Sequence, residues 1–333
     1  MILKREYRVF VKHLMKFSDY FEAWLNGNYY AKATPIGKKG DFYTAVSVGS
    51  LFGICIAKRI LKLANNFEGK IFIVEIGANE GYLLADIIQG IFTFSPERLA
   101  NFEFAIIEPH ENLRDLQNKN FKKRFGDEVK ISHFSSFDKA KFKNAIFIAN
   151  ELFDAFKCEI LDVDKILFVE NHKYEFKKAD DEILDFAQKF KIKKGEIPLG
   201  YFDFANDMRK SAENFAFIAF DYGQMRAKND FSLRVYKKHE VFDFFEIENL
   251  SEFYGVSDIT YDVNFEILKA AFEENSSKMF DFKKQSTALV DFGAVEILEM
   301  FLKHSKTAYE NAKLQLNHLL NEFSRFNMIE FRG

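Results

Sequence analysis

Short apolar runs, several followed by stretches with helical periodicity, organise the chain from residue 70 onward. These runs are nearly continuous in apolar residues and are bounded by turn residues: 71–76, 102–107, 129–132, 145–150 and 215–220. Such runs are typical of strands that are covered on both faces. Because helical patterns follow the first two, around 81–92 and 110–120, the sequence predicts an α/β fold with a doubly wound, mostly parallel sheet.

The segments outside this alternation have other patterns. Residues 1–30 carry apolar side chains at helical spacing, and a second helical pattern runs from Leu51 to Leu61. Residues 156–177 read as consecutive short strands, so we expect an inserted antiparallel segment there. A helix near 307–323 precedes a last strand at 326–331.

Composition narrows the class of protein. The 333 residues have a formal net charge of −3, which argues against a general nucleic-acid binder because neutralising phosphates requires clustered positive charge. The two cysteines, Cys55 and Cys158, exclude a disulfide scaffold and a CxxC zinc module. No apolar run reaches the length of a membrane span, and the charged start of the chain is unlike a signal peptide. We therefore expect a cytoplasmic protein without a metal site.

The chain contains 42 phenylalanines. They could form an aromatic binding surface, or they could replace Leu and Val in the core. We favour the core.

Candidate chemistry follows the predicted strands, since ligands bind beyond the carboxyl ends of strands in an open parallel sheet. The first strand continues through Glu75 into a turn with Gly77, Asn79 and Gly81. Gly77 allows a tight turn, and Gly81 allows the next helix to approach the strand. Asn79 occupies a place where glycine is usual, and Asn is a residue that tolerates positive φ. The spacing is not the GxGxxG of dinucleotide-binding proteins.

Acidic and amide side chains follow the other strands. Glu108 ends the second strand and is suited to accept hydrogen bonds from a ribose, which indicates a cofactor containing adenosine without saying which one. Asn150, Glu151 and Asp154 follow the fourth strand, and Asp221 follows the fifth. Asp154 could instead cap a helix, and Asp221 could belong to a simple turn.

Several segments together resemble the MidA-like proteins, a family of class I S-adenosylmethionine-dependent methyltransferases that includes the mitochondrial complex I assembly methyltransferase. The resemblance runs from about residue 19 to the C-terminus. The segments that carry it are IGKKGDFYT (36–44), VEIGANEGYLLADI (74–87), IEPHENLRDLQ (107–117), IANELFDAF (148–156), FDYG (220–223), LRVYKKHEV (233–241) and DITYDVNF (258–265).

The resemblance implies a Rossmann-like methyltransferase sheet with an antiparallel C-terminal strand, N-terminal helices and an inserted antiparallel segment. We divide the chain accordingly. Residues 1–66 would form a helical cap that carries the GDFYT motif. Residues 67–333 would form the methyltransferase domain, with insertions at about 156–214 and 224–278.

The resemblance also assigns roles to residues. S-adenosyl-L-methionine would be the cofactor and S-adenosyl-L-homocysteine the product. The residues implied to bind it are Gly40, Phe42, Tyr43, Thr44, Glu75, Gly77, Asn79, Gly81, Glu108 and Asn150. The acceptor would be a protein, with an arginine side chain as in the mitochondrial member. Glu151, Asp154 and Asp221 are the candidates to hold its guanidinium, which is always charged at neutral pH.

The chain departs from the family at two places. Family members usually carry a second glycine where this chain has Asn79, and a His and an Asp where it has Asp262 and Asn264. Two alternatives stay open: a nicotinamide oxidoreductase on the same topology, and a cofactor-binding assembly factor for a respiratory complex that acts by holding a partner subunit. A homo-oligomer is also left open.

Overall fold

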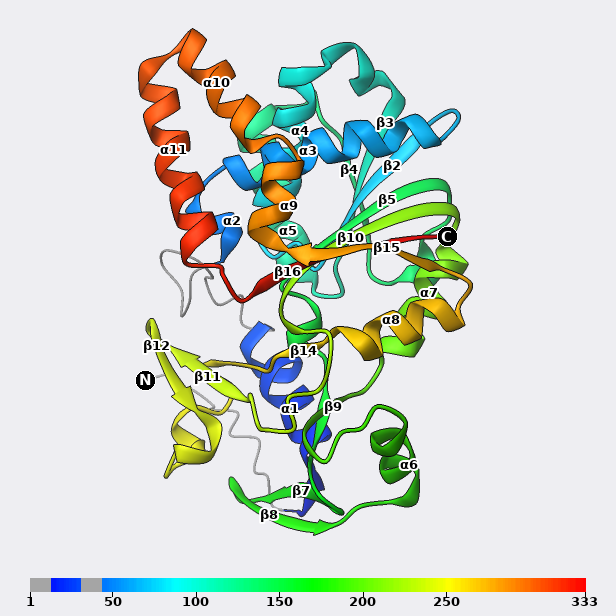
Figure 1. Cartoon of the computed structure of the whole chain (residues 1–333), viewed down its shortest axis with the longest axis vertical. Helices are drawn as coiled ribbons and strands as arrows, with labels where there is room; N and C mark the ends of the chain where they lie inside the picture. The colour runs from blue at the N-terminus through cyan, green and yellow to red at the C-terminus, as the bar shows by residue number, and fades with distance from the viewer. Residues whose placement is uncertain (1–12, 31–43) are drawn as a thin grey trace, which may run out of the picture.

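The computed structural model describes residues 13–30 and 44–333. A central sheet with strand order β15-β16-β10-β5-β2-β3-β4 dominates it (Figure 1), and β14 pairs with the end of β10. Its strands are β2 (Ile71–Ile76), β3 (Phe102–Ile107), β4 (Ile131–Phe134), β5 (Phe142–Asn150), β10 (Ala212–Gln224), β14 (Val263–Asn264), β15 (Lys278–Lys284) and β16 (Phe326–Arg332). The strands from β4 to β10 run parallel, whereas β16 runs antiparallel to β10. The predicted sheet and its antiparallel C-terminal strand are confirmed.

Side chains of a strand alternate between the two faces of the sheet, and the central strands are apolar at consecutive positions, so both faces are apolar. In β10, Ile218 and Phe220 belong to one buried cluster, and Phe217 and Ala219 belong to the other. Helices cover both faces (Figure 1). Those on the first face are α3 (Leu51–Leu63), α4 (Tyr82–Phe94), α5 (Glu111–Phe125), α9 (Gln285–Asp291), α10 (Ala294–His304) and α11 (Lys306–Asn321). On the other face lie α6 (Asp181–Lys189), α7 (Tyr201–Ser211) and α8 (Phe265–Glu274).

A third buried cluster forms a separate module, drawn in the lower part of Figure 1. Helix α1 (Phe17–Trp24) packs there on two small sheets. The first contains β1 (Met15–Lys16), β6 (Cys158–Asp162), β7 (Lys165–Glu170), β8 (Lys173–Lys178) and β9 (Lys194–Pro198). The second contains β11 (Arg234–Lys237), β12 (Glu240–Asp243) and β13 (Asp258–Thr260). Trp24 is fully buried, and its indole N–H donates to the carbonyl of Ser257 at 2.8 Å. The module is therefore built from three distant parts of the chain.

The two helices at the start of the described chain pack in different places. A helix over 1–30 was expected, but within the described residues Met15 and Lys16 pair with β7, and α1 begins at Phe17. Helix α1 packs with the inserted strands, whereas α3 packs on the central sheet. The described residues before 67 contribute to two cores, because α1 and α3 bury their apolar faces against different sheets. The expected insertions at about 156–214 and 224–278 contain α7 and α8, which pack on the central sheet.

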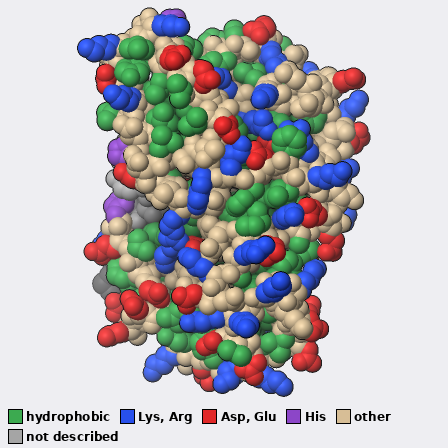
Figure 2. Space-filling model, viewed as in Figure 1, with side chains coloured by type: hydrophobic (Ala, Val, Ile, Leu, Met, Phe, Trp, Pro, Cys, Tyr) green, Lys and Arg blue, Asp and Glu red, His purple; other side chains and the backbone are tan. Residues whose placement is uncertain are grey.

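The phenylalanines mostly fill these three clusters, as the core interpretation expected. Phe92 and Phe280 are the two that are strongly exposed among the described residues. On the face drawn in Figure 2, basic and acidic side chains are interspersed. Within residues 13–30 and 44–333, no helix is both long and apolar enough to cross a bilayer, and no cluster of side chains has the make-up of a metal site.

Candidate active site

A cavity of about 940 Å³ lies beyond the carboxyl ends of β2, β3 and β5. Strand β2 is the switch point of the sheet, because β3 lies on one side of it and β5 on the other. The cavity collects most of the expected cofactor residues from separate elements. It is lined by Thr44, Glu75, Gly77, Asn79, Glu108, Asn150 and Glu151. Gly40, Phe42 and Tyr43 fall outside the described residues, and Gly81 does not line the cavity although Glu80 and Tyr82 do.

The turn after β2 has the backbone conformation that its sequence predicts. Gly77 has φ +67° and Asn79 has φ +46°, so both residues adopt the left-handed conformation. Gly81 has φ +80°, and a Cβ there would lie 2.8 Å from the ring of Phe121. Glycine at 81 therefore lets the start of α4 approach α5.

Two side chains of α5 hold this turn, and sequence reasoning missed both. The Gln117 amide donates to the carbonyl of Asn79 at 2.7 Å, and the Asn120 amide donates to the carbonyl of Glu80 at 3.0 Å. Gln117 is fully buried. The only signal in the sequence was that Gln117 lies at helical spacing from Leu113 and Phe121, the two apolar residues that α5 buries.

The buried carboxyl of Glu75 serves the fold as well as the cavity. Its Oε2 accepts a hydrogen bond from the N–H of Leu84 at 3.0 Å, in the first turn of α4. Burial raises the pKa of Glu75 to about 8, although this hydrogen bond opposes the shift. Glu75 thus fixes the helix that follows the turn.

Glu108 lies at the end of β3, where the sequence predicts a ribose-binding acid. Its Oε1 accepts from the N–H of His110 at 3.0 Å, and Arg114 donates to its backbone carbonyl at 2.7 Å. Burial raises the pKa of Glu108 to about 7. The carboxylate and its protonated form are therefore close in energy near neutral pH.

Glu151 has a strained backbone at the end of β5. Its φ is +52°, which is unusual for a residue with a side chain, and its N–H donates to the carbonyl of Phe220 at 2.9 Å. Its Oε1 accepts from the Asn150 amide at 2.9 Å. Burial and the nearby Asp154 raise the pKa of Glu151 to about 8. The Oδ1 atom of Asn150 is buried and has no hydrogen-bond partner among the described residues.

Asp221 and Asp154 are enclosed behind Glu151 and line neither cavity near it. Asp221 Oδ2 accepts from the N–H groups of Leu152 at 3.1 Å and Phe153 at 2.9 Å, and its Oδ1 accepts from the N–H of Tyr222. Burial raises the pKa of both carboxyl groups. Asp221 therefore fixes the loop after β5, which is more than the simple turn that the sequence left open.

The hydroxyl of Tyr222 links Asp154 to the inserted module. The Tyr222 hydroxyl donates its one proton to Asp154 Oδ2. In its contact with Thr260, the Thr260 hydroxyl is therefore the donor and the Tyr222 oxygen the acceptor. Asp154 accordingly belongs to a buried chain of hydrogen bonds between β10 and β13.

A second pocket of about 260 Å³ lies next to the first and shares Glu151 with it. Its walls come from the end of β10, the β11–β12 hairpin, β13 and the corner between α11 and β16. They include Tyr222, Tyr236, Asp258, Thr260, Glu322, Arg325 and Phe326. Sequence reasoning did not find this pocket, because its walls come from four segments that only the fold brings together.

Three features together define the class of Rossmann-like methyltransferases. The sheet is doubly wound with an antiparallel last strand, a glycine-containing turn follows β2, and an acidic residue follows β3. A family model described as "Putative S-adenosyl-L-methionine-dependent methyltransferase" matches residues 51–283. The chain belongs to this family, and its cofactor is S-adenosyl-L-methionine.

Solved structures agree on the fold. A Burkholderia thailandensis protein described as a "likely methyl transferase" and bound to S-adenosyl-homocysteine is 18% identical, with a TM-score of 0.83 over 96% of this chain and 88% of that one. A native crystal structure from the same organism, of a protein described as uncharacterized, is also 18% identical, with a TM-score of 0.80 over 96% of this chain and 87% of that one. No curated protein matches the chain.

The first cavity fits the cofactor by the chemistry of its walls. The buried Oδ1 of Asn150, which has no partner within the part of the chain that the structure describes, is an acceptor of the kind that an ammonium group requires. Glu108 supplies an acceptor for ribose hydroxyls, and a side chain at Gly77 would come within 3.0 Å of Leu152 Cδ1. The failed GxGxxG spacing and the family match together remove the nicotinamide alternative.

The backbone conformation of Asn79 can be tested by substitution. We expect Asn79→Gly to change the Kd for S-adenosylhomocysteine less than about threefold, because glycine adopts positive φ freely. Asn79→Val should weaken binding at least about tenfold, since the left-handed conformation costs a side chain about 1–2 kcal/mol and a β-branched residue the most. The measurement is titration calorimetry. Asn171→Val is the matched control, because Asn171 also has positive φ but lies in the β7–β8 turn, away from the cavity. Equal affinity of Asn79→Val and wild type would contradict this account.

The raised pKa of Glu108 predicts a pH dependence of cofactor binding. Ribose hydroxyls prefer the carboxylate, so with a pKa of about 7 the affinity for S-adenosylhomocysteine should rise about tenfold from pH 6 to pH 8. Glu108→Gln should bind more weakly and lose this part of the dependence, as measured by calorimetry across the range. An identical pH profile in the variant would show that Glu108 does not contact the cofactor.

Proposed function

We propose that this protein transfers the methyl group of S-adenosylmethionine to a nitrogen of a protein side chain, and that the side chain is arginine. The observation that carries the proposal is the position of Glu151. Glu151 lines both the cavity that fits the cofactor and the second pocket. An acceptor in the second pocket would therefore reach the cofactor beside this group.

Residues of the first cavity would hold the cofactor. The 77–81 turn and Thr44 would face its amino-acid part, Asn150 its ammonium, and Glu108 its ribose. When bound, S-adenosylmethionine supplies an electrophilic methyl group on a positively charged sulfur. The acceptor nitrogen would form the new N–C bond as the C–S bond breaks, and the electron pair of the C–S bond would stay on sulfur. The methylated nitrogen would then lose a proton to water.

Glu151 is suited to orient a cationic acceptor. Its carboxyl has a pKa of about 8 before anything binds, so it is largely protonated at neutral pH. A guanidinium beside it would favour the carboxylate, and the released proton would leave a charge-assisted pair. Tyr236 and Phe326 also line the second pocket, and aromatic rings attract cations. These features support arginine over an uncharged acceptor.

Asp154 and Asp221 have supporting roles in this proposal. Asp154 positions the ring of Tyr222 through its hydroxyl, and Asp221 holds the loop that carries Glu151. Of the three carboxylates expected to hold the guanidinium, we therefore assign the direct contact to Glu151 alone. The other two act through it.

Location and organisation are part of the proposal. Both cysteines are free and buried, which is compatible with a cytoplasmic protein that meets its acceptor as a separate partner. We propose a methyltransferase domain formed by the central sheet and its helices. A cap formed by α1 and the two inserted sheets would cover the site, because Glu22, Asn26 and Tyr30 from this cap also line the first cavity.

Substitution of Glu151 tests the proposal. Glu151→Gln should lower kcat for methyl transfer at least about 100-fold, because a neutral amide cannot orient or stabilise the cation, while the Kd for S-adenosylhomocysteine stays within about threefold. Asp154→Asn should lose about tenfold, since Tyr222 still finds an oxygen to donate to. The measurement is transfer of tritium from labelled S-adenosylmethionine to an unmethylated protein extract, followed by amino-acid analysis.

The matched control is Glu103→Gln, an exposed carboxylate on β3 that pairs with Lys70 far from the site. Full transfer rates in both Glu151→Gln and Asp154→Asn, with normal cofactor binding, would contradict the proposed roles. Cofactor binding without any transfer by the wild type would favour the assembly factor instead.

A further inference from the structure

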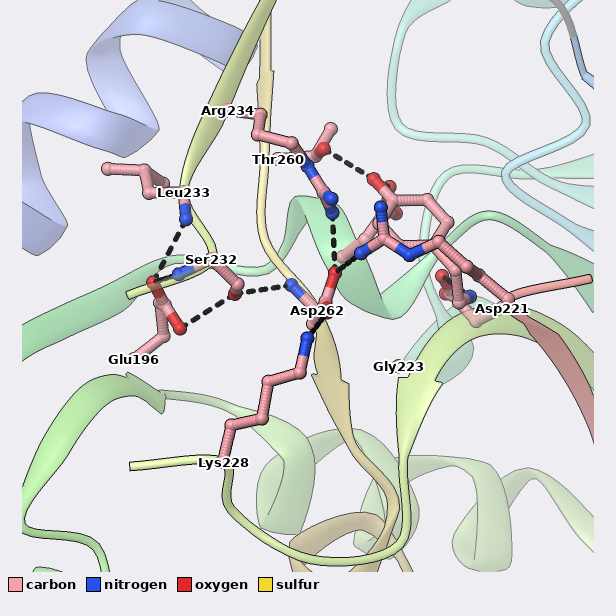
Figure 3. A network of polar contacts seen from close by, with 12 residues as sticks. Glu196, Asp221, Gly223, Lys228, Ser232, Leu233, Arg234, Thr260 and Asp262 are labelled. Atoms are coloured by element: carbon pink, nitrogen blue, oxygen red, sulfur yellow. Dashed lines mark hydrogen bonds and ion pairs between the residues drawn. The ribbon is translucent and has the colours of Figure 1, made fainter. Parts of the chain in front are cut away.

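Three cations meet at one carboxylate beside the second pocket. Arg234 and Arg325 both donate to Asp262 Oδ1, at 2.5 and 2.6 Å, and Lys228 lies 3.4 Å from Oδ2. Figure 3 shows Arg234 and Lys228 reaching Asp262 from opposite sides. Asp262 is nearly buried, whereas Arg325 is about half exposed. The three cations come from β11, the β10–β11 loop and the α11–β16 corner, so Asp262 joins parts of the chain that are distant in sequence.

The two arginines also lie over the ring of Tyr222. Their guanidinium carbons are 5.4 Å and 5.9 Å from the ring centroid, for Arg234 and Arg325 respectively. Tyr222 itself lines the second pocket and donates to Asp154. The position of the arginines is thus coupled to the ring that forms a wall of the pocket.

Arg325 is the member of this group that lines the second pocket. A guanidinium in that place would repel a cationic acceptor and attract an anionic one. Asp262 supplies the opposing charge: burial alone would raise its pKa, but Arg234, Arg325 and Lys228 outweigh burial and lower it. Asp262 therefore remains ionised at neutral pH and neutralises Arg325 within hydrogen-bond distance.

We propose that Asp262 is a positioning residue that sets the charge preference of the second pocket, by holding Arg325 over Tyr222 and neutralising it there. With Asp262 present, the pocket favours a cationic side chain. Without it, Arg325 is free to turn toward Glu151 or Glu322 across the pocket, where it would occupy the place of a cation. This inference rests on the proposed function, because it takes the second pocket as the acceptor site.

The test measures binding of two small probes to the protein loaded with S-adenosylhomocysteine. The probes are Nα-acetyl-arginine-N-methylamide and Nα-acetyl-glutamate-N-methylamide, and ligand-observed NMR gives their affinities. We expect Asp262→Asn to weaken the arginine probe about tenfold, because the released Arg325 then occupies the place of a cation in the pocket. The glutamate probe should bind more tightly to this variant than to the wild type.

A double variant separates this role from a merely structural one. In Asp262→Asn combined with Arg325→Gln, the freed cation is absent, so the affinity for the arginine probe should return to within about threefold of wild type. A loss caused by a damaged fold would persist in the double variant. Asp230→Asn is the matched control, since Asp230 pairs with Lys194 on the surface and lines neither of the two pockets.

The outcomes distinguish the two proposals. If wild type and Asp262→Asn bind the arginine probe equally, the role of Asp262 is overturned and the acceptor site still stands. The same conclusion follows if the double variant fails to recover the affinity. A wild-type protein that binds S-adenosylhomocysteine but neither probe contradicts the arginine acceptor. The crystal structure of Asp262→Asn then decides the inference by itself: Arg325 turned into the pocket supports it, and Arg325 still over Tyr222 overturns it.

Discussion

The buried carboxylate of Asp221 is the constraint on which the site depends. It is fully buried and accepts hydrogen bonds from the N–H groups of Leu152, Phe153 and Tyr222. An unpaired buried N–H is costly, so these bonds fix the path of the chain after β5. That path forces Glu151 into a left-handed conformation between the two pockets. The geometry proposed for methyl transfer follows from this one clamp.

The central sheet was predictable from sequence, because its strands are buried on both faces and appear as apolar runs. The turn at 77–81 was also predictable, since Gly77, Asn79 and Gly81 mark backbone with positive φ. The third core was not predictable from sequence, because α1 packs on strands more than 130 residues away along the chain. The periodicity of a segment does not indicate which other segment it packs against. For the same reason the supporting role of Gln117 and the second pocket emerged only from the fold.

Asn79, Asp262 and Asn264, the residues that the sequence analysis sets apart from the MidA-like proteins, each have a local role in the structure. Asn79 adopts a positive φ, which glycine also adopts freely. Asn264 caps α8, with its Oδ1 accepting from the N–H groups of Glu266 and Ile267, and an amide oxygen serves this purpose as well as a carboxylate. Asp262, in contrast, gathers three cations around one carboxylate. The last departure therefore changes the charges beside the proposed acceptor site, whereas the first two preserve the fold.

The central claim is that the first cavity holds S-adenosylmethionine. Titration calorimetry with S-adenosylhomocysteine, and with NAD as the comparison, tests it most directly because no acceptor is required. The account predicts one site per chain with micromolar affinity for S-adenosylhomocysteine and no heat from NAD. Binding of NAD alone, or of neither compound, would contradict the assignment of Gly77, Glu108 and Asn150 to this cofactor.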